Sequence, residues 1–137
     1  MLPVTLFGTV TPFQGNGRLL GYPTANITTQ TDLADGVYFG YATLGDYIDK
    51  PSLIFVGVPL TFGQKQRRIE AHILDIPDQD YYDKHLTAQI LHFHRSNQKF
   101  SGVEELVKVI KGDDRVARDW FVKNPLAKSS DVANTGD

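Results

Sequence analysis

The segment GRLLGYPTANITT near the N-terminus combines residue types that bind phosphorylated ligands. Its glycines, Gly17 and Gly21, permit a tight turn and a close approach of the backbone to a ligand, and Arg18 between them could hold a phosphate. Thr24 and Asn26 are two residues apart, which in an extended segment places the hydroxyl and the amide oxygen on one side. Two neutral, hard oxygens could complete the shell of a Mg²⁺ ion whose other ligands are waters and nucleotide phosphates. A plain turn is the alternative, and the residue types alone leave both interpretations open.

A carboxylate inside an apolar alternating pattern is the second candidate for chemistry. The stretch RRIEAHILDI predicts a strand with two faces, one carrying Ile69, Ala71 and Ile73 and the other carrying Glu70, His72 and Leu74. Glu70 is either an outward-facing solubilising residue or a general base that accepts a hydroxyl proton, a role worth about 10²- to 10⁴-fold in rate. His72 could share that site, or it could be a packed or hydrogen-bonded histidine of the strand.

Two other patterns bear on metal or phosphate binding, and neither favours it. His92 and His94 share a strand face at the spacing of a metal pair, but no third ligand is evident nearby, so a metal is not favoured there. The chain has no Gly-x-x-x-x-Gly-Lys-Ser/Thr motif, which excludes phosphate binding by a Walker loop.

The candidate functional side chains must be positioned by the elements around them. The sequence shows short runs of Val, Ile, Phe, Tyr and Thr, separated by Gly, Pro and Asp about every ten residues. This pattern predicts strands over residues 4–10, 37–44, 52–58, 68–76 and 86–94. Because no helical pattern intervenes, we expect an antiparallel sheet closed into a small barrel.

After Phe100 the apolar period changes from strand-like to helical. Ser101 and Glu104 have the spacing of a capping box, and apolar residues follow at helical intervals to Ile110. A second, short helix is expected from about Asp113 to the proline at 125. The polar end of the chain predicts one domain over 1–125, followed by a disordered tail over 126–137.

The composition restricts the class of protein. With 137 residues, 41% hydrophobic and 22% charged, the chain fits one soluble domain. A net charge of −2 argues against a nucleic-acid partner, and the basic cluster QKQRR is interpreted as a solvated hairpin tip. The absence of cysteine excludes disulfides and Cys-based zinc sites. Because the sequence shows no secretory signal and no apolar run of membrane-spanning length, we predict a cytoplasmic protein without a membrane partner.

The order of the motifs resembles that of the riboflavin kinase (flavokinase) family, including the kinase module of bifunctional bacterial FAD synthetases. GRLLGYPTAN resembles the family's Gly-Arg-x-x-Gly-aromatic-Pro-Thr-Ala-Asn signature, DGVYFGYA its Gly-Val-Tyr strand, and TFG its Pro-Thr-Phe-Gly turn. IEAHILDIPDQDYYDKHL resembles its Glu-x-His segment, RSNQKF its Arg-x-x-x-x-Phe loop, and EELVKVIKGDDRVAR its terminal helices. The similarity covers about residues 8 to 121.

The resemblance implies a mainly β fold, a six-stranded antiparallel Greek-key barrel with C-terminal α-helices. It implies an enzyme that uses ATP and Mg²⁺ to phosphorylate the ribityl 5′-hydroxyl of riboflavin, giving FMN and ADP. Glu70 would be the catalytic carboxylate, and Thr24 and Asn26 the metal ligands. The nucleotide would be bound by Gly17, Arg18, Gly21, Thr24, Ile73, Asp75 and Tyr82. The flavin would contact Arg95 and Phe100, and a monomer is expected.

Departures from the family pattern fall on the loops. Phe13 replaces a usual glycine, and FVGVPLTF puts Phe55 in place of an asparagine and moves the proline from the position of Leu60 to Pro59. Asn97 replaces a frequent glutamate. Three hypotheses therefore stand: an active riboflavin kinase, a flavin- or nucleotide-binding module without turnover, and a kinase for another small alcohol. Since no His-x-Gly-His stretch is present, a complete chain is expected to stop at FMN.

Overall fold

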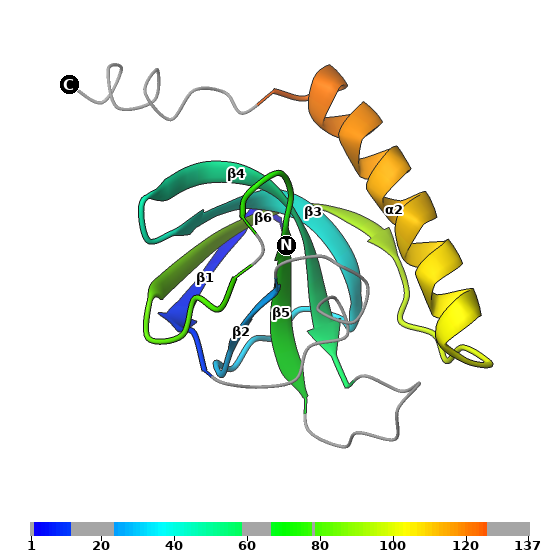
Figure 1. Ribbon diagram of the computed structural model, residues 1–137, viewed down its shortest axis with the longest axis horizontal. Coiled ribbons are helices and arrows are strands. Elements are labelled where there is room, and N and C mark those ends of the chain that lie inside the picture. Colours follow the sequence, from blue (N-terminus) through cyan, green and yellow to red (C-terminus); the bar gives the residue numbers. More distant parts are fainter. Residues whose placement is uncertain (1, 12–23, 59–66, 78, 126–137) are drawn as a thin grey trace.

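The structure is a computed structural model that describes residues 2–11, 24–58, 67–77 and 79–125. Its strands are β1 (Val4–Thr9), β2 (Thr24–Ile27), β3 (Gly36–Leu44), β4 (Tyr47–Gly57), β5 (Arg68–Ile73) and β6 (His85–Arg95), and they are followed by α2 (Val103–Lys123). The six strands form one antiparallel sheet in the order β1-β6-β3-β4-β5-β2. Since β6 returns to lie beside β3 after the run β3-β4-β5, the sheet has Greek-key order. The predicted fold class is confirmed (Figure 1).

The sheet curls until its two edge strands come together. The backbone N–H of Thr11, just after β1, donates to the carbonyl oxygen of Asn26 in β2 over 2.9 Å. Gly8 of β1 lies so close to β2 that a Cβ atom there would be 3.3 Å from Cβ of Ile27. The short strand β2 is thus held on both sides, by β5 and by the end of β1.

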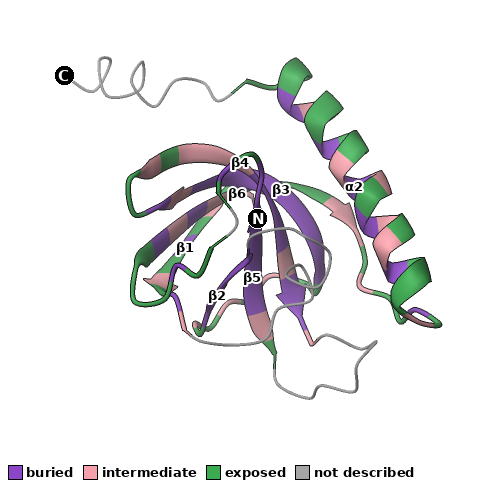
Figure 2. Cartoon of the chain, in the orientation of Figure 1, coloured by how far each residue is buried: buried purple, intermediate pink, exposed green. Residues whose placement is uncertain are grey.

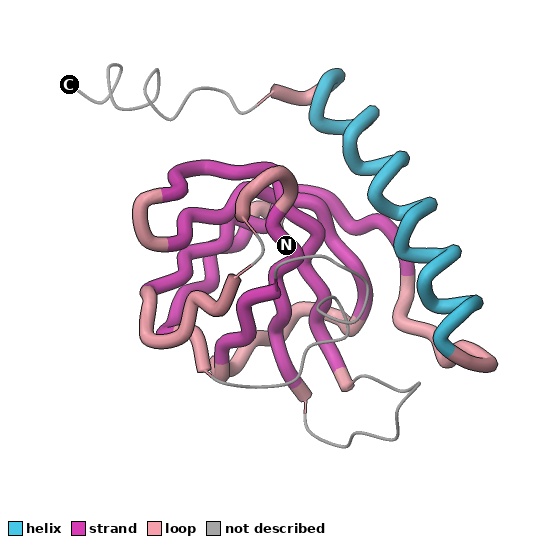
Figure 3. The backbone as a smooth tube through the Cα atoms, in the orientation of Figure 1, coloured by secondary structure: helices cyan, strands magenta, loops and turns pink. Residues whose placement is uncertain are grey.

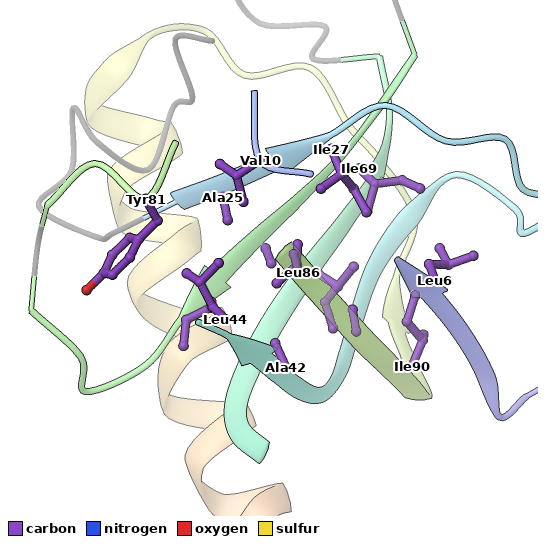
Figure 4. Packing of buried hydrophobic residues seen from close by; sticks show 14 of the residues in the cluster. Leu6, Val10, Ala25, Ile27, Ala42, Leu44, Ile69, Tyr81, Leu86 and Ile90 are labelled. Atoms are coloured by element: carbon purple, nitrogen blue, oxygen red, sulfur yellow. The ribbon is translucent and has the colours of Figure 1, made fainter. Parts of the chain in front are cut away.

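Alternating side chains from every strand fill the interior of the curled sheet. Ala25 and Ile27 from β2 and Ile69, Ala71 and Ile73 from β5 are each no more than 1% exposed. Figure 4 shows inward-pointing residues of β1, β2, β3, β5 and β6 gathered in this core. The two faces predicted for RRIEAHILDI are confirmed, and they leave Glu70 and His72 on the outer face of β5.

The helix α2 packs on part of that outer face. Ala117 and Phe121 contact an apolar cluster formed by Val37, Phe39, Tyr41, Leu53 and Leu74. Figure 2 shows the buried positions of α2 directed toward the sheet and the exposed ones directed away from it. The helix therefore covers β3 and β4 next to the Glu70 face of β5.

Among the described residues, no helix combines the length and apolar character needed to cross a bilayer.

Two helices were predicted after Phe100, and this prediction was wrong: a single helix runs over Val103–Lys123 (Figure 3). Gly112 costs about 1 kcal/mol in a helix relative to Ala, but the apolar stripe continues past it through Ala117 and Phe121. The capping box was also wrong, since the N-cap is Gly102 without a side-chain cap. Instead, the backbone N–H of Ser101 donates to Oε1 of Glu105 over 2.7 Å.

The sequence pattern also missed parts of the sheet. The strand β2 is too short to show a clear period, and β4 begins at Tyr47 rather than at residue 52. Arg67, predicted to lie in a solvated tip, instead donates to Asp35 and to the carbonyl oxygens of Thr31 and Leu33. The Arg67 guanidinium thus links the connection between β2 and β3 to the start of β5 by hydrogen bonds.

Candidate active site

Strand pairing aligns the candidate residues in two rows across the outer face of the sheet. Successive register partners form a first row from β6 to β2 through Arg95, Val37, Phe55, Glu70 and Asn26. The adjacent row runs through His92, Phe39, Leu53, His72 and Thr24. Directly opposed residues in a sheet project from the same face, so each side chain adjoins its row neighbour. Glu70 is therefore next to Asn26, and His72 next to Thr24.

Glu70 and His72 form a buried hydrogen-bonded pair. His72 Nε2 lies 2.6 Å from Glu70 Oε1, and each side chain is only 8% exposed. An ionised carboxylate only accepts hydrogen bonds, so Nε2 carries the proton in a pair with ionised Glu70. Burial lowers the pKa of the Arg68 guanidinium two residues away, and the negative charge of Glu70 opposes that shift. Glu70 is not a solubilising surface residue, because it is held inside a polar site.

Thr24 and Asn26 present buried side-chain oxygens to the outer face of the sheet. Their side chains lie on the outer face beside Glu70 and His72, and the residues are 8% and 3% exposed. Thr24 Oγ1 and Asn26 Oδ1 have no hydrogen-bond partner within the described part of the chain. A buried polar atom without a partner costs about 1–3 kcal/mol, so it points to a ligand that satisfies it. Neutral hard oxygens suit Mg²⁺, and this pair therefore fits the predicted metal site.

A second polar cluster, which the sequence did not reveal, joins β6 to α2. Asp113 is 5% exposed and accepts hydrogen bonds from Arg95 Nε (3.0 Å) and Nη2 (2.8 Å). His94 Nε2 lies 2.9 Å from the same carboxylate, and His92 stacks on Trp120 with ring centroids 5.3 Å apart. A sequence signal for Asp113 exists, since it interrupts the apolar stripe of α2 between Ile110 and Ala117.

The fold and the arrangement of these residues agree with the similarity of the chain to known proteins. Residues 1–121 match the riboflavin kinase (Flavokinase) family. The chain belongs to the riboflavin kinase family. The match spans the whole sheet and nearly all of α2, and it confirms the predicted resemblance and class of enzyme.

Riboflavin kinases are among the individual relatives of the chain. Human riboflavin kinase is 28% identical over 124 residues, which cover 85% of this chain and 80% of the human protein. The trifunctional protein RibF/MnmA of Mycoplasmoides gallisepticum is 35% identical over 136 residues, 93% of this chain but only 20% of that protein. The crystal structure of riboflavin kinase from Trypanosoma brucei superimposes with a TM-score of 0.68 at 25% identity, covering 92% of this chain and 81% of that one. The chain thus spans one fifth of the Mycoplasmoides gallisepticum protein and about four fifths of the human and Trypanosoma brucei proteins.

The described residues that the riboflavin kinase resemblance assigns to the nucleotide are dispersed in the structure. Ile73 points into the core, and Tyr82 is 41% exposed beyond the end of β5. Asp75 has a left-handed backbone conformation (φ 61°) and binds Arg118 of α2 through two hydrogen bonds of 2.9 and 3.0 Å. Gly17, Arg18 and Gly21 lie outside the described residues. Of the four that the structure describes, only Thr24 adjoins the pair Glu70–His72.

The residues assigned to the flavin are brought together at the other end of the first row. The guanidinium of Arg95 lies 5.8 Å from the centroid of the Phe100 ring, which is buried against Leu106 and Ile110. Three inter-strand steps separate Arg95 from Glu70, which is about 14 Å along the sheet. The residues that the resemblance assigns to the flavin and to phosphoryl transfer therefore lie toward opposite ends of the first row.

The structure describes two of the residues at which the chain departs from the riboflavin kinase pattern. Phe55 is half-buried in the first row, directly beside Glu70. Asn97 Nδ2 donates to the carbonyl oxygen of Val58 over 2.9 Å and fastens the segment after β6 to the end of β4. Phe13, Pro59 and Leu60 lie outside the described residues.

Asp75 provides a test that separates a structural role from a nucleotide-binding role. The hydrogen bonds from Arg118 hold the pKa of Asp75 below its ordinary value of 3.8. A carboxyl group whose pKa is lowered in the folded state stabilises that state at pH values above the pKa of the unfolded chain. This contribution is lost as the pH falls through the pKa of the folded state. The Asp75 side chain is 70% exposed, so solvent screening limits the effect to about 0.5 kcal/mol.

We therefore expect Asp75→Asn, which preserves the left-handed conformation, to lower the free energy of unfolding by about 0.5 kcal/mol at pH 7. The difference from the wild type should shrink between pH 7 and a pH well below 3.8, because protonation removes the same charge from Asp75. Urea unfolding at both pH values measures this effect. A structural role leaves the KM for ATP unchanged in the variant, whereas a several-fold rise in that KM shows a nucleotide contact.

Proposed function

We propose that this protein transfers the γ-phosphoryl group of ATP to the ribityl 5′-hydroxyl of riboflavin, giving FMN and ADP in a Mg²⁺-dependent reaction. The observation that carries the proposal is the juxtaposition of Glu70 with Asn26 in a buried site, where the oxygens of Thr24 and Asn26 have no hydrogen-bond partner in the part of the chain that the structure describes. Membership of the riboflavin kinase family supports the reaction class. Phosphoryl transfer needs a proton acceptor beside a cation, and the proposal assigns these roles to Glu70 and to the oxygens of Thr24 and Asn26 on this face of the sheet.

Glu70 acts in this proposal as the general base. Its carboxylate accepts the proton of the ribityl hydroxyl as that oxygen attacks the γ-phosphorus in line with the departing ADP oxygen. Thr24 Oγ1 and Asn26 Oδ1 would hold Mg²⁺ together with the nucleotide phosphates. When bound, Mg²⁺ neutralises the negative charge that develops on the phosphoryl oxygens.

The flavin is proposed to lie across the strands from Glu70 toward Arg95 and Phe100. Between these ends the half-buried Phe55 supplies an apolar floor, whereas its row neighbour Val37 is buried in the cluster that contacts α2. A floor of this kind packs against the ribityl chain and the flavin ring by burial of apolar surface. A cytoplasmic location and a monomeric state stay predictions of the sequence.

Chromatographic detection of FMN tests the proposed function. The purified chain is incubated with riboflavin, ATP and Mg²⁺, with parallel reactions that lack Mg²⁺ or contain another small alcohol instead of riboflavin. We expect FMN to form only with riboflavin and Mg²⁺ present together. Flavin binding without FMN would instead support the binding module, with Phe55 beside the base as the first substitution to revert. Phosphorylation of the other alcohol alone would support the third hypothesis.

A further inference from the structure

We propose that His72 is a positioning residue for catalysis: it donates a hydrogen bond that holds the carboxylate of Glu70 in the orientation needed to accept the substrate proton. This inference rests on the proposed function, because it assigns a role within the same reaction.

In this geometry, His72 contacts one oxygen of the Glu70 carboxylate, and the other oxygen is available to the substrate. His72 Nε2 lies 2.6 Å from Oε1, which commits one carboxylate oxygen to the histidine. The second oxygen, Oε2, is then the one that accepts a proton from a hydroxyl group. Both residues are 6% exposed, and both are anchored through backbone pairing of β5 with β4 and β2.

Glutamate needs such a partner when it acts as a base. Its long side chain has several rotatable bonds, and burial alone does not select one rotamer. A base must lie about 2.6–3.2 Å from the proton-bearing oxygen, and a displacement of about 1 Å can cost roughly 10²-fold in rate. The arrangement of a reactive group held by a second, buried polar group recurs in nucleophilic and acid–base sites. The hydrogen bond from His72 supplies that constraint here.

The surroundings of His72 favour this role over simple packing. Its row neighbours are Leu53 on β4, which cannot hydrogen-bond through its side chain, and Thr24 on β2. The imidazole therefore directs Nε2 along its own strand to Glu70 rather than across to β4. A histidine that served only as a core residue would affect stability without depending on Glu70.

A matched pair of amide variants tests the inference. His72→Gln places a nitrogen donor near the position of Nε2, whereas His72→Asn is one methylene shorter and does not reach Glu70. We expect kcat for FMN formation within about fivefold of the wild type for His72→Gln and about 10- to 100-fold lower for His72→Asn. The KM values for riboflavin and ATP should change less than about twofold, because His72 binds neither substrate. His92→Asn, on the same face and in the same row, serves as the control and should retain the wild-type kcat.

The inference further requires that His72 act through Glu70. In a Glu70→Gln background, His72→Asn should cause no additional loss of kcat, because the group it positions no longer accepts a proton. Equal losses in the two backgrounds, or equal kcat for the Gln and Asn variants, would overturn the inference. An inactive wild-type chain would instead refute the proposed function itself. Urea unfolding of each variant identifies any loss of kcat that comes from a loss of folded protein.

Discussion

We expect Glu70→Gln to lower kcat for FMN formation by about 10²- to 10⁴-fold, because the variant keeps the shape of the side chain and loses its basicity. The amide oxygen of glutamine still accepts the hydrogen bond from His72, so the buried pair is preserved. The KM for riboflavin should change little, since Arg95, proposed to bind the flavin, lies about 14 Å away along the sheet. Product chromatography under saturating ATP and Mg²⁺ measures kcat, and urea unfolding measures stability.

The control for this substitution is Glu104→Gln, which changes an exposed carboxylate in the first turn of α2. It should leave kcat unchanged, since α2 presents this residue to solvent. A fall of less than about tenfold for Glu70→Gln would remove Glu70 from the role of base, because general-base catalysis contributes at least 10²-fold in typical enzymes.

The second large effect is expected for Thr24→Val, which should make the protein more stable and nearly inactive. Valine has the shape of threonine without the hydroxyl, so it removes a buried oxygen that has no partner among the described residues. The free energy of unfolding should rise by about 1 kcal/mol, since an unsatisfied buried polar group costs about 1–3 kcal/mol. Valine also suits a β-strand. The rate of FMN formation should fall at least about 10²-fold through loss of a metal ligand.

A gain in stability with a loss of activity is the signature of a group kept for function. Thr5→Val on the exposed face of β1 is the matched control and should change neither quantity appreciably. Thermal unfolding with and without Mg²⁺ and ADP gives a readout independent of turnover, and ligand stabilisation should be weaker in Thr24→Val. If the variant were destabilised by more than 1 kcal/mol, Oγ1 of Thr24 would have a structural partner.

Much of the chemistry could be predicted from local patterns. The two-residue period of RRIEAHILDI is enough to separate Glu70 and His72 from the core-facing Ile69 and Ala71, because successive side chains of a strand point to opposite faces. The same rule places Thr24 and Asn26 on one side of any extended segment. These relations need no knowledge of the rest of the chain.

The adjacency of the two motifs could not be predicted in the same way. Asn26 and Glu70 are far apart in the sequence, and they become neighbours through the register of β2 with β5. A shift of one residue would turn every side chain of β2 to the opposite face and place Asn26 in the core. The curl of the sheet, which brings the end of β1 against β2, holds that register.

The continuity of α2 and the burial of Asp113 likewise depend on tertiary contacts. Gly112 and Asp113 suggest a break when only helix propensity is considered, but the outer face of the sheet selects one continuous apolar stripe. Asp113 is tolerated in that stripe because Arg95 and His94 on β6 satisfy its carboxylate. The sequence by itself determined which side chains share a strand face and which residue types could bind phosphate, metal and proton, because these follow from local periodicity and chemistry. Only the tertiary structure decided which of them meet, because strand register and helix docking arise from the burial of apolar surface between distant segments.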